Sequence, residues 1–115
     1  MPNNKKDADI YIQHILDSIS WIEKYTENVT IEKFLTEHLI QDGVIRQLEI
    51  IGEASNKTPE EYKTKHSDIP WKDIIGMRNK LIHGYFGVDI EAVWNTAQKD
   101  IPELKIKLLL KRGNK

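Results

Sequence analysis

Apolar residues recur every three or four positions along most of this chain, which is the spacing of one face of an α-helix. The first stripe consists of Ala8, Ile12, Ile15, Ile19 and Ile22, and the next of Ile40, Val44, Leu48, Ile51 and Ser55. The most regular stripe comes last and consists of Ile90, Val93, Trp94, Ala97, Ile101, Leu104 and Leu108. No segment alternates apolar and polar residues between turn signals, so we predict no sheet.

Capping residues indicate where these helices begin. Asp7 and Asp89 are placed to cap the first and last helices, and Thr30 to cap a short helix between them. The segment Thr58-Pro59-Glu60-Glu61 has the order of a cap, a proline in the first position and two acids near the positive end of the dipole. We therefore predict a further helix that starts there.

Two prolines and two glycines shape the second half of the chain. A helix that starts at Trp71, after Pro70, is predicted to reach His83, and Gly84 and Gly87 to loosen the segment that follows. Pro102 lies inside the last stripe and is predicted to kink or locally open that helix. The expected fold is an all-α bundle of about four to five helices joined by short loops.

Composition supports a single domain that spans residues 1–115. A chain of 115 residues buries roughly 65% of its unfolded surface, enough for a modest core. It has no cysteine, which excludes disulfides, thiolate catalysis and zinc sites of the cysteine type. No apolar run approaches the ~20 residues of a membrane span. We expect a cytoplasmic protein without a membrane anchor, and its net charge of −1 predicts that any nucleic-acid contact is local.

The segment from Arg78 to Tyr85 contains an R-x-x-x-x-H-x-Y pattern that could carry chemistry. An arginine can bind a phosphate bidentately, and a histidine can transfer protons near neutral pH. In RNA the 2′-hydroxyl is a built-in nucleophile, so His83 could act as base or acid while Arg78 stabilises charge on the scissile phosphate. Asn79 could position a phosphate oxygen or the ribose. This chemistry needs no metal and no cofactor, and it yields a 2′,3′-cyclic phosphate and a 5′-hydroxyl.

On one ideal helix, Arg78 and His83 would not face the same small pocket. Five residues at about 100° each place the two side chains about 140° apart around the axis. The helix could unwind before Gly84 and turn His83 inward, or two copies of the helix could pair across a shared cleft. A symmetric dimer makes such an interface naturally, so we favour a homodimer.

Other residues near the motif have both a functional and an ordinary interpretation. Glu53 follows Gly52, whose missing side chain permits close helix approach, so its carboxylate could reach Arg78; a solvent-exposed carboxylate is the equal alternative. Lys72 and Lys80 could form a small RNA-binding patch, although a solvated face is the commoner meaning of such residues. Arginine, histidine and tyrosine in this spacing are also common as ion-pair, helix-end and core residues.

Four segments together resemble the HepT-like toxins of the HEPN ribonuclease group. They are Val44-Ile45-Arg46-Gln47-Leu48-Glu49-Ile50-Ile51-Gly52-Glu53-Ala54, Ile69-Pro70-Trp71, Met77-Arg78-Asn79-Lys80-Leu81-Ile82-His83-Gly84-Tyr85, and Val93-Trp94 through Asp100-Ile101-Pro102. Their order and spacing cover most of the chain up to Leu109. The combination is far more specific than the eight-residue motif alone.

The resemblance implies a HEPN-like helical bundle, a homodimer with a composite cleft, and a metal-independent endoribonuclease toxin of a type II-like toxin–antitoxin system. On that basis Arg78 and His83 map onto the catalytic pair. The implied partner is an MntA-like nucleotidyltransferase antitoxin, which transfers AMP onto the motif tyrosine, here Tyr85. Two alternatives stay open: a non-catalytic helical module that docks a minimal nucleotidyltransferase, and a purely structural dimerisation domain.

Overall fold

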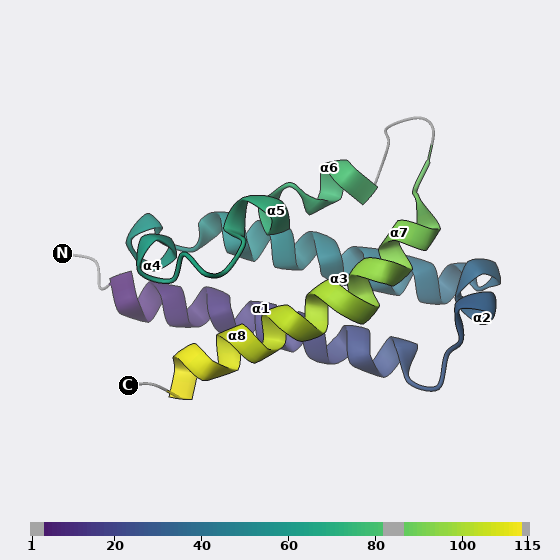
Figure 1. Ribbon diagram of the computed structural model, residues 1–115, viewed down its shortest axis with the longest axis horizontal. Coiled ribbons are helices and arrows are strands. Elements are labelled where there is room, and N and C mark those ends of the chain that lie inside the picture. Colours follow the sequence, from purple (N-terminus) through teal and green to yellow (C-terminus); the bar gives the residue numbers. More distant parts are fainter. Residues whose placement is uncertain (1–3, 82–86, 114–115) are drawn as a thin grey trace.

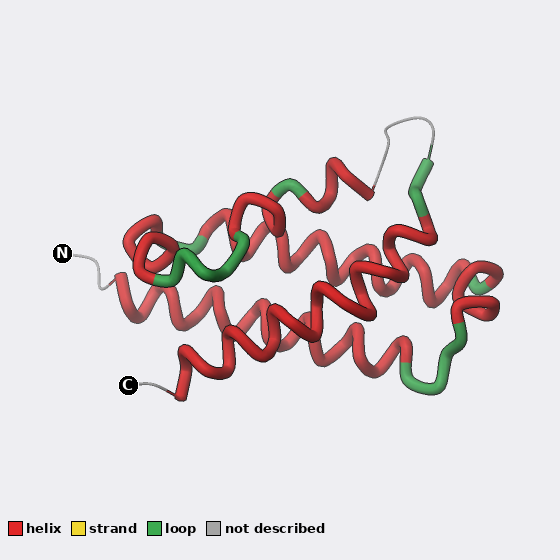
Figure 2. Tube along the Cα trace, in the orientation of Figure 1, coloured by secondary structure: helices red, strands yellow, loops and turns green. Residues whose placement is uncertain are grey.

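The computed structural model describes residues 4–81 and 87–113, and it confirms the predicted all-α fold. No described residue belongs to a β-strand (Figure 2). The helices are α1 (Asn4–Thr26), α2 (Ile31–Thr36), α3 (His38–Lys57), α4 (Glu60–Lys65), α5 (Trp71–Ile75), α6 (Met77–Leu81), α7 (Ile90–Asn95), the π-helix η2 (Thr96–Asp100) and α8 (Ile101–Gly113). The structure has more helical segments than the four to five predicted, because the predicted helix from Trp71 is interrupted and the last one is divided into α7, η2 and α8.

Helices α1 and α3 pack along each other and form the centre of the bundle, with α8 against α1 on one side and α5 and α6 against α3 on the other (Figure 1). The predicted stripes supply the core, since Ile15, Ile19, Val44 and Ile51 are fully buried. No described helix combines the length and the apolarity needed to cross a membrane. The long helices thus provide a fixed frame for the shorter ones.

Local chemistry explains how α1 turns into α2. Asn28 adopts a positive φ of 59°, which asparagine tolerates better than most residues. The Thr30 side chain then accepts a hydrogen bond from the Lys33 N–H at 3.2 Å, so the predicted cap is confirmed. Helix α3 is fixed to α2 by Gln41, whose buried side-chain amide donates to the Phe34 carbonyl at 2.8 Å.

Two predicted caps are wrong. Helix α1 already begins at Asn4, which places Asp7 inside the first turn instead of before it. Thr58 does not cap α4: the N-cap is Pro59, and the buried Thr58 hydroxyl donates to the Ala54 carbonyl at 2.9 Å. Thr58 closes the end of α3 because the preceding carbonyls lack helical partners and lie within its reach.

The predicted helix from Trp71 is interrupted at Gly76. Its first part, α5, ends at Ile75, and a new helix, α6, starts at Met77. A Cβ atom at Gly76 would lie 3.2 Å from the Lys72 carbonyl oxygen, a tight contact that glycine avoids. The helix starts at Trp71 as predicted, and this residue anchors it: Trp71 is 8% exposed, and its indole N–H donates to the His66 carbonyl at 3.1 Å.

The last three helical segments follow each other without a loop. The Asp89 carboxylate accepts a hydrogen bond from the Ala92 N–H at 3.1 Å, so its predicted cap on α7 is confirmed. In η2 the Ile101 N–H donates to the Thr96 carbonyl, a bond that spans five residues. Pro102 follows immediately and has no N–H to donate. The predicted local opening is therefore a π-turn just before the proline.

Candidate functional site

The structure describes only part of the R-x-x-x-x-H-x-Y motif. Helix α6 contains Arg78, followed by Asn79 and Lys80. His83 and Tyr85 lie outside the described residues. The shared cleft and the pairing of Arg78 with His83 therefore stay predictions.

Helix α6 is a single short turn held on its inner face. Met77 and Leu81 are 7% and 6% exposed and join the core, whereas Asn79 between them is exposed. The Gly76 carbonyl accepts hydrogen bonds from the N–H groups of Asn79 at 3.0 Å and Lys80 at 3.3 Å. The interruption at Gly76 thus supplies the first acceptor for the helix that carries the motif.

One backbone hydrogen bond joins Leu81 and Asp89, the described residues that flank the rest of the motif. The Asp89 N–H donates to the Leu81 carbonyl at 2.9 Å. The same residue, Asp89, caps α7, and Leu81 is buried on α6. Both ends of the segment that contains His83 and Tyr85 are therefore anchored at one point of the bundle.

The predicted basic patch is partly neutralised. The Lys80 ammonium lies 3.8 Å from the Asp73 carboxylate, and both side chains are largely exposed. Such an exposed pair contributes little to stability but lowers the net positive charge beside α6. Lys72 is also exposed. The two lysines do lie near the motif helix, on α5 and α6, but with only a weak local excess of positive charge.

Glu53 has a different described partner from the one proposed for it. Its carboxylate lies 3.4 Å from the Lys57 ammonium, one helical turn further along α3, and its side chain is 66% exposed. The structure supports the predicted close helix approach at Gly52, because a Cβ atom there would lie only 3.3 Å from the Ile74 carbonyl oxygen. Helices α3 and α5 therefore approach closely at Gly52, while Glu53 itself resembles an ordinary surface residue.

A second cluster of polar groups joins α8 to the loop before α5. The Lys111 ammonium donates to the Asp68 carboxylate at 2.7 Å, and Lys107 donates to the Asp68 carbonyl at 3.0 Å. The hydrogen bond from Lys111 holds the pKa of Asp68 below its ordinary value of 3.8. Burial, followed by the charge of Lys111, lowers the pKa of His66. This cluster fastens α8 and lies apart from the motif.

Sequence reasoning missed Thr96 and Asp100, which line a cavity together with Met77 and Leu81 of the motif helix. Pro102 was the available signal, since a proline inside a stripe predicts a local opening of the helix. That opening is η2, and it forms one wall of the cavity. Among the described residues, no three histidine, aspartate or glutamate side chains are grouped in a way that could hold a metal ion.

Comparison with known proteins gives a consistent result. Residues 15–109 match the family model described as "Ribonuclease HepT-like". The chain is 46% identical over 103 residues to the Thermococcus cleftensis protein named "Probable ribonuclease HepT", covering 90% of this chain and 94% of that protein. It is 43% identical over 95 residues to a Caldanaerobacter subterraneus protein named "Putative RNase", covering 83% and 85% respectively.

One relative is much longer than this chain. It is a Methanocaldococcus jannaschii protein named "Gamma-glutamylcyclotransferase and putative RNase", 49% identical over 105 residues. The match covers 91% of this chain but 47% of that protein, so the chain spans about half of its length. No solved structure matches the chain.

Proposed function

Because the chain belongs to the HepT-like ribonuclease family, we propose that it is a metal-independent endoribonuclease toxin of a type II-like toxin–antitoxin system. Arg78 and His83 are its catalytic pair, and RNA is its substrate. The single observation that carries this proposal is the complete R-x-x-x-x-H-x-Y motif inside the matched range of residues 15–109.

The reaction is a transfer of the phosphate within the RNA strand. A neutral His83 removes the proton from a ribose 2′-hydroxyl, and the 2′-oxygen attacks the adjacent phosphorus. The bond from phosphorus to the 5′-oxygen breaks, and that oxygen takes up a proton. Arg78 pairs with the equatorial oxygens, where negative charge grows. The products are a 2′,3′-cyclic phosphate and a 5′-hydroxyl, and DNA is not cleaved because it lacks the 2′-hydroxyl.

The placement of α6 is compatible with this role. The helix buries Met77 and Leu81 and exposes Asn79, so one of its faces is open to a large substrate. Asn79 is then available to contact a phosphate oxygen or the ribose. Glu53 and the lysines Lys72 and Lys80 are at most supporting residues, since Glu53 pairs with Lys57 and Lys80 with Asp73.

The active form that we propose is a homodimer. An ideal helix separates Arg78 and His83 by about 140°, and the described interruption, at Gly76, precedes both residues. It therefore does not itself bring His83 round toward Arg78. A two-fold axis that pairs the motif segments of two chains would assemble one cleft from both copies.

Regulation would act on Tyr85. A nucleotidyltransferase antitoxin of the MntA type transfers AMP from ATP: the phenolic oxygen attacks the α-phosphorus, and pyrophosphate leaves. The added phosphodiester places negative charge two residues from His83, where it repels the RNA backbone and competes for Arg78. The described residues on either side of that segment, Leu81 and Asp89, are joined by a backbone hydrogen bond.

The test is cleavage of total cellular RNA by purified protein in EDTA, after intact mass spectrometry has excluded AMP on Tyr85. We expect cyclic-phosphate ends from the wild type and at least a hundredfold slower cleavage by Arg78→Ala and His83→Ala. Lys57→Ala, on the exposed face of α3, is the control and should cleave normally. No cleavage of any RNA class by the unmodified dimer would refute the proposal and favour a non-catalytic docking module.

A further inference from the structure

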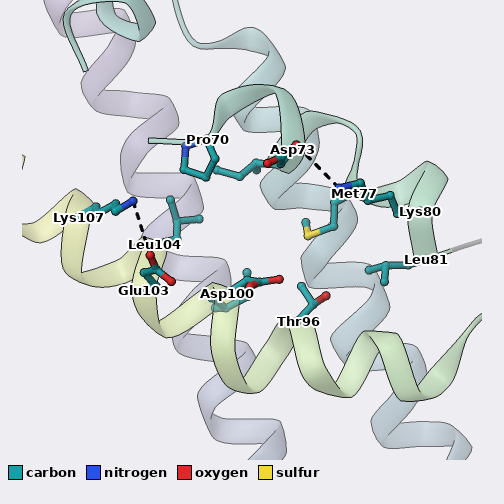
Figure 3. A pocket seen from close by; sticks show the side chains of 12 residues that line it. Pro70, Asp73, Met77, Lys80, Leu81, Thr96, Asp100, Glu103, Leu104 and Lys107 are labelled. Atoms are coloured by element: carbon teal, nitrogen blue, oxygen red, sulfur yellow. Dashed lines mark ion pairs between the residues drawn. The ribbon is translucent and has the colours of Figure 1, made fainter. Parts of the chain in front are cut away.

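A cavity of about 210 Å³ lies between two pairs of helical segments: α5 and α6 on one side, η2 and α8 on the other (Figure 3). Its walls are apolar and are formed by Ile74, Met77, Leu81, Ile101 and Leu104. Pockets for drug-sized ligands typically measure roughly 300–1,000 Å³. This cavity therefore has room for a single long side chain and not for a large ligand.

Five ionisable side chains surround the apolar walls, and four of them are paired. Asp73 pairs with Lys80 at 3.8 Å, and Glu103 with Lys107 at 3.7 Å (Figure 3). The fifth, Asp100, has no ion-pair or hydrogen-bond partner for its carboxylate among residues 4–81 and 87–113. Figure 3 shows this carboxylate pointing into the cavity, on the side of Met77. The cavity thus presents one uncompensated negative charge beside an apolar surface.

The wall that carries Asp100 is the π-helix. Thr96 and Asp100 are the first and last residues of η2, and both line the cavity. Single π-turns inside longer helices occur frequently at functional sites. Here the turn accompanies Pro102 and widens the helix where it borders the cavity.

We propose that this cavity binds an arginine side chain of a partner protein. Its aliphatic stem would lie against Met77 and Leu104, and its planar guanidinium would pair bidentately with Asp100. Lysine fits less well because its ammonium is a point charge with stronger hydration. The three carboxylates of Asp73, Asp100 and Glu103 outnumber the ammonium groups of Lys80 and Lys107, so the lining has a net charge of −1, which disfavours phosphate and hence RNA as the occupant.

The proposal is tested by NMR titration of ¹⁵N-labelled protein with N-acetyl-arginine amide. We expect saturable shifts, with millimolar affinity, in the amides of α5, α6 and η2. N-acetyl-citrulline amide has the same shape without the charge and should bind about tenfold more weakly, since hydrogen bonds between charged groups are the stronger ones. The affinity of N-acetyl-lysine amide should lie between those of the arginine and citrulline probes.

Two substitutions make the experiment specific. Asp100→Asn should weaken the arginine probe about tenfold, whereas Asp42→Asn, an equivalent change on the exposed surface of α3, should leave its binding unaltered. Asp100 is exposed, so its replacement does not threaten folding. Equal binding of the arginine and citrulline probes, no saturable shifts, or an Asp100→Asn variant that binds normally would each overturn the proposal. A short RNA that shifts the amides of η2, the cavity wall opposite the motif helix, and that the arginine probe displaces would overturn it in favour of nucleic acid.

Discussion

The π-turn at Thr96–Asp100 exists, in our interpretation, because it accommodates Pro102. A π-turn is equivalent to one extra residue inserted into an α-helix. Deleting the exposed Gln98 should therefore restore a continuous α-helix and keep both flanking stripes in register. In that helix, however, the ring of Pro102 would collide with the carbonyl four residues before it. The deletion and Pro102→Ala should consequently be coupled.

The magnitudes follow from the cost of a proline inside an α-helix. Deletion of Gln98 alone should lower the free energy of unfolding by about 3 kcal/mol, which is that cost. Pro102→Ala alone should change it by about 1 kcal/mol or less, because the π-turn tolerates either residue there. The double variant should lie within about 1 kcal/mol of the wild type, so the coupling free energy is about 3 kcal/mol when the two smaller changes are neglected.

The assay is urea denaturation followed by circular dichroism, at a fixed protein concentration so that any self-association contributes equally. Deletion of Ile106 serves as the control, since this exposed residue lies in the regular part of α8. Its loss rotates the fully buried Leu108 out of the core and should cost about 2–5 kcal/mol. Pro102→Ala should not rescue that variant. If deletion of Gln98 costs the same with and without Pro102, the proline does not explain the π-turn.

Three further predictions concern single residues. Ser55→Ala should raise the free energy of unfolding by about 1 kcal/mol, because the buried Ser55 hydroxyl has no hydrogen-bond partner in the described structure; thermal denaturation measures it. Lys111→Met should destabilise the protein at neutral pH, and the difference from wild type should shrink as the pH falls below about 4, since the lowered pKa of Asp68 stabilises only while its carboxylate is charged. Gly87→Ala should cost about 1–2 kcal/mol, because the φ of Gly87 is +92°; an unchanged unfolding midpoint would contradict this.

The long helices could be predicted from sequence because many residues contribute to each pattern. Over the 23 residues of α1 and the 20 of α3, a helical stripe is hard to mistake, and its members Ile15, Val44 and Ile51 are fully buried. Caps depend on one residue each and are less certain. Thr30 and Asp89 cap the helices expected of them, whereas Thr58 bonds backward to α3 because a threonine between two helices can serve either one.

The candidate site was less predictable because tertiary packing determines it. A single glycine inside a helical pattern is usually tolerated, so nothing local distinguished Gly76 from Gly52. In the structure, Gly76 lies where the predicted helix is interrupted, whereas Gly52 lies where α3 approaches α5 closely. Asp100 and Met77 likewise line one cavity only because the fold brings η2 and α6 to opposite sides of it. Arg78 could be proposed from sequence because its motif is local, and its role stays a prediction.

The two proposals place their ligands on different sides of α6, and this separation has a physical reason. Met77 and Leu81 face the cavity, whose border carries three carboxylates against two lysines and so a net charge of −1 that disfavours phosphate. Asn79 lies about 200° around the helix from Met77, at about 100° per residue, and is exposed. RNA would therefore approach the Asn79 side, and an arginine-bearing partner the Met77 side. A partner in the cavity would not compete with RNA for phosphate contacts; it would act on the motif through the position of α6 itself, which is held by Met77, Leu81 and the bond from Asp89.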